Sequence, residues 1–370
     1  MTGKGKLRSL MVTVVLLIGL PPAGVVCTGR DVMPFLEFPP RTQTVEHAPF
    51  SWPVFIFLAA SIAAVVFPFL LRVVRNFRKS PAPAAAARFP WWGRAGLLFG
   101  AAAWVLAWTR FEWLAPLQRY TFTPLWLAFI VVINALTFRR TGRCLMTHRT
   151  AYFLKLFAAS ALFWWLFEYL NRFVQNWYYT ASSDFSALEY FIAATLPFST
   201  VLPAVLSVEE WLASSPRSAA GLDHFPPVRF RHPRRIAAAA LIASAAGLFL
   251  IGIFPDQLFP LLWTAPLILL VSFQCLENRP SFFPTLGNGD WRRVFRFALA
   301  ALICGFFWEM WNLYSLAKWI YTVPYVNRFH LFEMPVLGYS GYLPFGLECA
   351  VAARLLAGSR AAGEETTPAV

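Results

Sequence analysis

The sequence alternates between long apolar runs and short polar connections that contain most of its Arg residues. A helix that crosses the hydrocarbon core of a membrane needs about 20 mainly apolar residues. The runs that approach this length predict about ten membrane-spanning helices, near residues 9–26, 52–74, 95–110, 123–138, 151–171, 187–206, 235–254, 257–275, 294–314 and 335–357. The fold class predicted by this pattern is all-α, a polytopic transmembrane helical bundle.

The charge of the connections alternates along the chain. Clusters of Arg and Lys follow the second, fourth and eighth spans and precede the seventh, whereas each intervening connection holds at most two cations. Cationic loops remain in the cytoplasm. We therefore expect a multi-pass protein of the bacterial inner membrane with both termini in the cytoplasm.

The first span has two interpretations. Lys4, Lys6 and Arg8 precede an apolar run that ends at Pro21-Pro22, as in a signal peptide. No clean A-x-A cleavage site follows, which favours an uncleaved anchor. Cleavage would leave the orientation of every later helix unchanged.

Composition supports a membrane protein and excludes several other classes. Hydrophobic residues make up 58% of the chain and charged residues 14%, against roughly 45–50% and 25% in soluble domains. The net charge of +14 lies in loop clusters and not on one helical face, so no nucleic-acid partner is expected. The five Cys form no CxxC pair and no two His are spaced at i, i+4, so we expect no metal and no cofactor. The expected partners are membrane lipids and a hydrophobic small molecule; nothing in the sequence predicts an oligomeric state.

The chain contains an internal duplication. WWLFEYLN at 164–171 aligns with GFFWEMWN at 305–312, at an offset of 141 residues. Ordered matches continue over about 40 residues, through Trp177 with Trp319 and on to the pattern of Leu, Ser and Pro shared by 196–206 and 337–347. Each copy has four spans, an even number, which predicts the same orientation for both copies and an axis near the membrane normal.

The duplication predicts the following organisation: two N-terminal helices in 1–79, a cytoplasmic linker in 80–92, the first four-helix repeat in 93–212, a cytoplasmic connector in 213–232, the second repeat in 233–357 and a disordered cytoplasmic tail in 358–370.

Three carboxylates inside apolar runs are the candidate catalytic residues, namely Glu168, Glu309 and Glu348. An ionised side chain at the centre of a membrane helix costs about 2.5–3.5 kcal/mol on insertion scales, so such residues usually have a function. In a low-dielectric pocket a carboxylic acid can keep its proton at neutral pH and act as a general acid. Asn171 and Asn312 lie three residues after the first two Glu, on the same helical face, where an amide could orient the carboxyl group.

Aromatic residues surround these positions. With the two Asn, the candidate substrate-binding residues are Trp164, Trp165, Trp308, Trp311, Trp177, Trp319 and Tyr321. They predict an aromatic-lined pocket for a hydrophobic or cationic molecule. Two alternatives remain open: the rings form an interfacial aromatic belt, or Glu168 and Glu309 have a purely structural role, pairing with each other or with cations at the helix ends.

The segment LSVEEWL at 206–212 follows a Glu/Asn-bearing helix and an aromatic connection. In this layout the chain resembles the membrane lycopene cyclase domains, which contain duplicated helical units and a Pro-x-Glu-Glu type motif. The resemblance implies acid-catalysed cyclisation of a polyene, with Glu209-Glu210 as the motif. The chain departs from the pattern because Ser207 stands where Pro is expected, and the second copy keeps only Glu348 near the equivalent place.

These observations predict a membrane protein that handles a lipid or isoprenoid in an intramembrane pocket, with Glu as proton donor. If it is an enzyme, the chemistry is that of an acid-catalysed isomerase or cyclase. The alternative is a proton-coupled transporter or lipid-handling protein with its site at the repeat interface.

Overall fold

The computed structural model describes residues 3–83, 86–180 and 184–358 and is mostly helical. Its α-helices are α1 (Gly3–Cys27), α2 (Met33–Leu36), α3 (Trp52–Phe77), α4 (Trp91–Trp108), α5 (Ala115–Gln118), α6 (Phe122–Thr141), α7 (Leu145–His148), α8 (Thr150–Val174), α9 (Ala187–Phe198), α10 (Val201–Ala213), α11 (Pro233–Ile251), α12 (Pro255–Leu258), α13 (Ala265–Leu276), α14 (Arg292–Asn312) and α15 (Tyr342–Ala352). The strands are β1 (Trp177–Tyr179), β2 (Trp319–Tyr321), β3 (His330–Leu331) and β4 (Met334–Pro335).

The expected helical bundle with several candidate membrane spans is confirmed, but the count of ten is not. In the described residues, seven helical segments are long and apolar enough to cross a membrane: α1, α3, α6, α8, the α9–α10 pair, α11 and α14. An eighth is present if the segments Pro255–Trp263 and Ala265–Leu276, which are bent by 56° relative to each other, form one broken span.

Two other expected spans differ from the prediction for physical reasons. The helix α4 has 18 residues, carries Arg94 in its first turn and is not among the segments counted above. The helix α15 has only 11 residues, about 16 Å of α-helix, against a hydrocarbon core of about 30 Å. It is preceded by the 3₁₀ segment η6 (Val336–Gly341) and followed by the π-helical turn η7 (Ala353–Ala357). The expected tail lies outside the described residues beyond Gly358.

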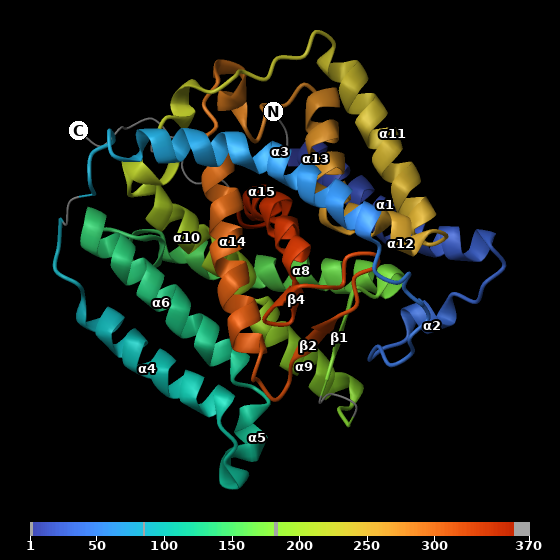
Figure 1. Cartoon of the computed structure of the whole chain (residues 1–370), viewed down its shortest axis with the longest axis horizontal. Helices are drawn as coiled ribbons and strands as arrows, with labels where there is room; N and C mark the ends of the chain where they lie inside the picture. The colour runs from blue at the N-terminus through green and yellow to red at the C-terminus, as the bar shows by residue number, and fades with distance from the viewer. Residues whose placement is uncertain (1–2, 84–85, 181–183, 359–370) are drawn as a thin grey trace.

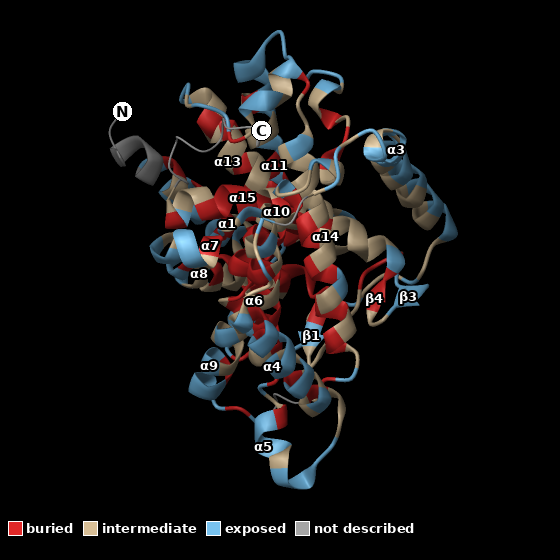
Figure 2. Cartoon of the chain, turned by 90° about the vertical axis from the view of Figure 1, so that its left-hand side faces the viewer, coloured by how far each residue is buried: buried red, intermediate tan, exposed pale blue. Residues whose placement is uncertain are grey.

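The core of the bundle is formed by α10, α14 and α15. Figure 1 shows these helices near the centre, with α4 and α6 together on one side and α11 and α13 on the other. In Figure 2 the buried residues gather on the central helices.

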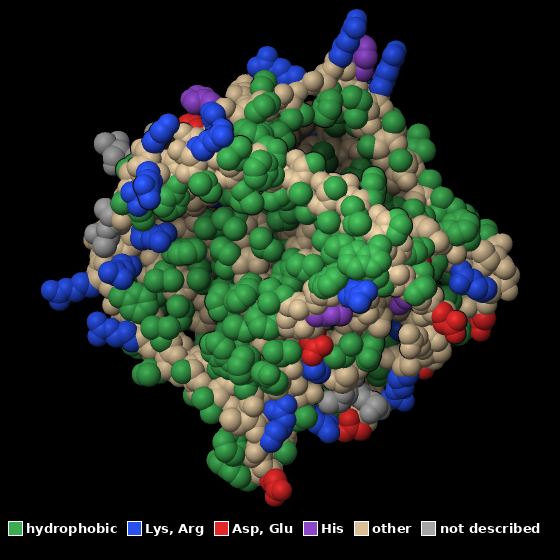
Figure 3. Space-filling view, viewed as in Figure 1, with side chains coloured by type: hydrophobic (Ala, Val, Ile, Leu, Met, Phe, Trp, Pro, Cys, Tyr) green, Lys and Arg blue, Asp and Glu red, His purple; other side chains and the backbone are tan. Residues whose placement is uncertain are grey.

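The helix α3 stands apart from this core and has no buried residue. Aromatic contacts hold it at both ends: Phe69 packs against Trp291 near one end, and Trp52 packs against Phe329 at the other. Figure 3 shows that apolar side chains cover much of the face that α3 crosses, whereas Lys and Arg lie mainly near its margins. Such a surface is suited to contact with lipid.

A short antiparallel strand pair joins two distant parts of the chain. In the pairing of β1 with β2, Trp177 lies opposite Tyr321, Tyr179 opposite Trp319, and Tyr178 opposite Ile320. One backbone hydrogen bond extends the pair on each side, from Thr180 N to Lys318 O and from Thr322 N to Asn176 O, both 2.8 Å long. The pair connects the segment that follows α8 to the segment that follows α14.

The connection between α1 and α3 packs on the same end of the bundle. Gln175 has a positive φ of 47° at the C-terminus of α8, and its side-chain oxygen accepts hydrogen bonds from Thr44 N at 2.7 Å and Val45 N at 2.9 Å. His47 contacts Asp256 at 2.7 Å. These contacts fix the connection beside β1.

Helix α1 packs closely against α11. A Cβ added at Gly24 would overlap the backbone carbonyl of Phe249, and one added at Gly252, just after α11, would overlap that of Pro21. Small residues allow helix backbones to approach in this way. The first helix is therefore an integral part of the bundle.

We expect Gly24→Leu to destabilise the protein by about 1–3 kcal/mol, because the larger side chain forces α1 away from α11. Thermal unfolding in detergent measures this effect. Gly19→Leu is the control, since Gly19 is exposed on the same helix and has open space around it. Equal melting temperatures for the two variants would show that the α1–α11 contact does not support the fold.

Candidate functional site

Glu168 lies near the C-terminal end of α8 and is almost fully buried. Its Oε1 atom accepts three hydrogen bonds: from Trp164 Nε1 at 3.0 Å, from Trp177 Nε1 at 3.2 Å and from the Tyr179 hydroxyl at 2.6 Å. Trp164 precedes Glu168 by one helical turn, and the other two donors come from β1. One carboxyl oxygen thus accepts hydrogen bonds from three aromatic side chains.

Glu309 occupies the corresponding place on α14 and is fully buried. Its Oε1 atom accepts hydrogen bonds from the hydroxyls of Tyr321 at 2.8 Å and Tyr342 at 2.7 Å. Trp319 Nε1 donates to the Tyr321 hydroxyl at 2.9 Å. The Oε2 atom is buried and has no hydrogen-bond partner among the described residues.

Tyr179 and Tyr321, the strand tyrosines that bond to the two Glu, have raised pKa values. Burial, together with the nearby Glu168 carboxyl group, raises the pKa of Tyr179 well above its usual value. Burial and the Glu309 carboxyl group raise the pKa of Tyr321 in the same way. Both phenols therefore keep their protons at neutral pH.

The Asn residues next to each Glu hold the strands and do not contact the carboxyl groups as hydrogen-bond partners. Asn171 donates to Trp177 O at 2.8 Å and accepts from Asn176 N at 2.9 Å. Asn312 donates to Trp319 O at 2.8 Å and accepts from Trp319 N at 2.9 Å. Each Asn thereby sets the start of a strand whose Trp and Tyr side chains return to the neighbouring Glu.

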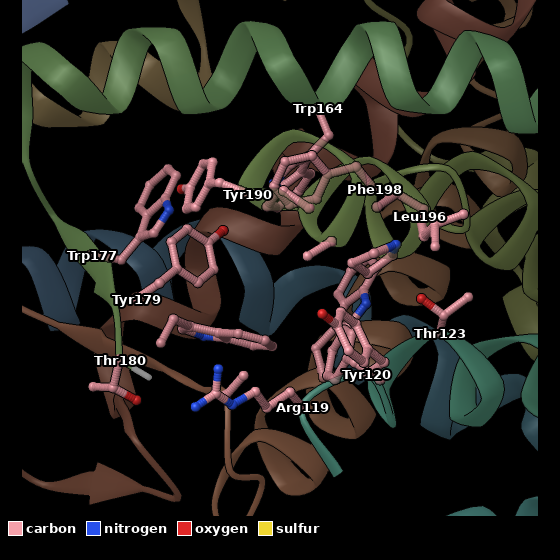
Figure 4. Close-up of a pocket in the computed structure, with 18 of the residues that line it drawn as sticks. Arg119, Tyr120, Thr123, Trp164, Trp177, Tyr179, Thr180, Tyr190, Leu196 and Phe198 are labelled. Carbon is pink, nitrogen blue, oxygen red and sulfur yellow. The ribbon is translucent and has the colours of Figure 1, made fainter. Parts of the chain in front are cut away.

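A cavity of about 400 Å³ lies between the two carboxyl clusters (Figure 4). The residues that form its wall are Arg119, Tyr120, Phe122, Thr123, Pro124, Trp164, Trp177, Tyr179, Thr180, Phe185, Tyr190, Ala193, Ala194, Leu196, Pro197, Phe198, Val201, Trp263, Trp308, Ala317, Trp319, Tyr321, Met334, Gly338, Gly341 and Tyr342. All the direct donors to Glu168 and Glu309 are in this wall, whereas the two Glu lie behind it. The volume falls within the range of about 300–1,000 Å³ found for small-molecule sites.

Figure 4 shows how the labelled side chains surround the space. Trp177, Tyr179 and Tyr190 lie together on one side, and Tyr120 and Thr123 lie across from them. The wall is almost entirely apolar or aromatic, with few polar groups. This arrangement can hold a hydrophobic molecule and present phenol hydroxyls to it.

The candidate substrate-binding residues divide into two groups. Five of them line the cavity: Trp164, Trp177, Trp308, Trp319 and Tyr321. The other aromatic candidates have different positions, because Trp165 donates to Thr195 Oγ1 at 3.0 Å and Trp311 packs against Trp126. Asn171 and Asn312 support the wall from behind.

The remaining carboxylates lie away from the cavity. Glu348 is buried on α15, where Oε1 accepts a hydrogen bond from Leu267 N at 3.2 Å and Oε2 has no partner among the described residues. Glu209 forms an ion pair with Arg296 at 3.3 Å, and Glu210 accepts from Leu145 N at 2.8 Å. The Glu-Glu pair that carried the resemblance to lycopene cyclase domains thus joins helices and does not line the cavity.

The helix-end cations have partners other than the two buried Glu. Arg172 donates to Pro34 O at 2.7 Å and to Phe35 O at 3.2 Å, and Lys318 pairs with Glu333. Among the described residues, no group of three His, Cys, Asp or Glu side chains is placed to hold a metal ion.

Several residues of the site were not among the candidates chosen from the sequence. Tyr179 could have been chosen, because it aligns with Tyr321 after one inserted residue. Tyr342 and Arg119 carry no local signal: Tyr342 reaches Glu309 only through the packing of α15 on α14, and Arg119 lies in the connection before α6.

Comparison with protein-family models, with curated proteins and with solved structures finds no match to this chain.

We expect Asn312→Ala to lower stability by about 1–3 kcal/mol for each backbone group of Trp319 that loses its partner. Thermal unfolding in detergent is the measurement. Asn327→Ala is a suitable control, because Asn327 is an exposed residue whose side chain hydrogen-bonds to His330. An unchanged melting temperature for Asn312→Ala would show that this amide does not hold β2.

Proposed function

We propose that this chain is an integral membrane protein that handles a lipid or isoprenoid in the aromatic cavity, with Glu168 and Glu309 as proton-holding groups. The observation that carries the proposal is that two buried carboxyl groups reach one apolar cavity through tyrosine hydroxyls in its wall. The same proposal assigns the protein to the bacterial inner membrane, with both termini in the cytoplasm and the β1–β2 pair at the outer side.

The environment of each carboxyl group suits it to hold a proton. Among the described residues, no cation forms a salt bridge with Glu168 or Glu309, and burial in an apolar interior disfavours the ionised form of a carboxyl group. A protonated carboxyl can donate to the phenol oxygen of Tyr179 or Tyr321. The phenol hydrogen then turns toward the cavity and moves to the substrate, so the tyrosine is unchanged at the end of the transfer.

Two such pairs on one cavity suit an isomerase or cyclase. Adding a proton to one carbon of an olefin and removing a proton from another carbon rearranges double bonds with no net consumption of protons. One carboxyl–phenol pair would donate and the other would accept. This requirement accounts for the presence of both Glu.

We further propose that the cavity lies on the pseudo-twofold axis of the duplicated unit. Three observations support this proposal. The β1–β2 pairing is symmetric about Tyr178 and Ile320, since Trp177 aligns with Trp319 and Tyr179 with Tyr321. Each Asn holds its strand by equivalent bonds. The packing of α4 on α6 resembles that of α11 on α13.

The two copies differ in which helical residue donates to the Glu, but each copy has such a donor. At the offset of 141, Trp164 corresponds to Gly305, and Val201 corresponds to Tyr342. In the first half the extra donor to Glu168 comes from Trp164; in the second it comes from Tyr342, whose ring occupies the space beside Gly305. Each Glu therefore keeps an aromatic donor from within the helices as well as one from its strand.

A proton-coupled transporter is the second candidate function. It is favoured by the position of the cavity between the two halves, where transporters with repeats bind their substrates. A transporter moves its substrate without altering it, so chemical analysis of the lipids separates the two candidates.

The test of the proposal is a lipid and pigment profile of cells that contain the wild type, Tyr179→Phe, Tyr321→Phe or Glu309→Gln, beside a deletion strain. We expect the Phe variants to lower product formation by about 100-fold or more, the range of general acid–base catalysis. Tyr178→Phe is the matched control, because Tyr178 lies between the other residues on β1 and points away from the cavity.

Profiles that stay unchanged in folded variants would exclude catalysis by these groups. If the deletion strain accumulates an unaltered lipid on one side of the membrane, the transporter is favoured. If every strain, including the deletion, has the same lipids in the same leaflets, both candidates fail.

This difference in the helical donor gives a separate test of the duplication. We expect Gly305→Trp alone to destabilise the protein, because the new ring overlaps Tyr342, and Gly305→Trp with Tyr342→Val to recover most of the melting temperature by reproducing the first half. A double variant no more stable than the single variant would contradict the proposed equivalence.

A further inference from the structure

The described wall of the cavity includes one charged side chain, that of Arg119. Among the described residues that line it, Arg119 is the only Lys, Arg, Asp or Glu. The guanidinium lies over the Phe185 ring, 5.5 Å from its centre, and Nη1 donates to Asp184 at 2.7 Å. The side chain of Arg119 is 35% exposed, so it lies at the mouth and not in the depth of the cavity.

Arg119 has capacity for a second anion. A guanidinium group has five N–H donors, and one of them bonds to Asp184 in the described part of the chain. The hydrogen bond from Arg119 lowers the pKa of Asp184, which is therefore ionised at neutral pH. Exposed pairs of this kind contribute only about 0–1 kcal/mol, so a carboxylate or phosphate can share the guanidinium or displace Asp184.

One side of the cavity is formed by small and apolar residues of two helices together with one Thr. Thr123 at the start of α6 and Ala193, Ala194 and Leu196 on α9 all belong to it. Leu196 is 50% exposed, and Leu127 on α6 is 39% exposed. Figure 4 shows Thr123, Leu196 and Tyr120 together on the same side of the space. The outer surface of this wall is apolar, which suits contact with lipid and not with water.

These observations together specify a ligand. An apolar chain fits the aromatic interior, where each buried CH₂ contributes about 0.8 kcal/mol. No carboxylate lines the cavity among the described residues, and Arg119 repels cations, so a positively charged amphiphile does not fit.

We propose that the ligand is an amphiphile with one anionic end group, which enters sideways from the outer leaflet between α6 and α9 and leaves its anionic end on Arg119. This inference rests on the proposed function, because it names the class of hydrophobic molecule and its route to the same cavity.

The experiment uses the full chain in detergent micelles, with a diazirine derivative of palmitate as the photoreactive probe and the matching palmityl alcohol as the uncharged probe. Mass spectrometry locates the labelled peptides. We expect palmitate to label residues 119–124 and 190–201, unlabelled palmitate to compete, and the alcohol to label these peptides about 10-fold less, as a charge-assisted hydrogen bond predicts. Hexadecyl phosphate as competitor shows whether the site prefers a phosphate or a carboxylate.

Three variants and one control, Ile192→Trp, test the parts of the inference separately. Arg119→Gln should weaken competition by palmitate about 10-fold, whereas Asp184→Asn should leave it unchanged or strengthen it. Ala194→Trp should block labelling. Ile192→Trp should not, because Ile192 is an exposed residue of α9 outside the cavity wall. Melting temperatures establish that each variant is folded.

Each failure has a distinct meaning. Equal labelling by acid and alcohol, or weakening by Asp184→Asn, overturns the role of Arg119 as anion site. Labelling that survives Ala194→Trp in a folded protein overturns the lateral entrance. If neither probe labels the cavity peptides in the wild type, the cavity does not bind a hydrophobic molecule and the proposed function fails as well.

Discussion

The need to satisfy a carboxyl group inside an apolar bundle organises this structure. Glu168 and Glu309 are buried, and indole and phenol groups of the protein donate hydrogen bonds to them. Three of those donors, Trp177, Tyr179 and Tyr321, come from strands that are held at their start by an Asn one turn after the Glu. Five residues of the cavity wall are thus also the hydrogen-bond donors to two buried acids.

The sequence allows much of this architecture to be predicted, because helix formation in a membrane depends on local composition. Apolar length identified α3, α6, α8, α11 and α14. The same criterion failed for α15, whose helix is flanked by 3₁₀ and π segments, and for the break between η4 (Phe259–Trp263) and α13. Pro266 near the start of α13 and Pro335 before η6 are local signals of these breaks, but apolar length alone does not take them into account.

The candidate site was predictable only where the two halves of the chain resemble each other. The alignment of Glu168 with Glu309 drew attention to the Asn and Trp residues around them, and five of the chosen aromatic residues do line the cavity. Trp165 and Trp311 share the same sequence neighbourhood but face other helices, because the side of a uniformly apolar helix that meets a cavity depends on tertiary packing. Tyr342 lies in a repeated segment but stands opposite Val201 in the other copy, and Arg119 lies in a connection outside the matched segments, so the repeat points to neither.

The pairing of β1 with β2 has a consequence for biosynthesis. Trp319 follows Trp177 by 142 residues, and translation proceeds at about 5–20 residues per second, so β1 waits roughly 7–28 s for its partner strand to be made. All the donors to Glu168 lie within 11 residues of it in the chain, so this cluster can assemble as soon as its own segment leaves the ribosome. The first buried acid can therefore gain its donors before the second half of the protein exists, so the nascent chain need not bury an unpartnered carboxyl group during that interval.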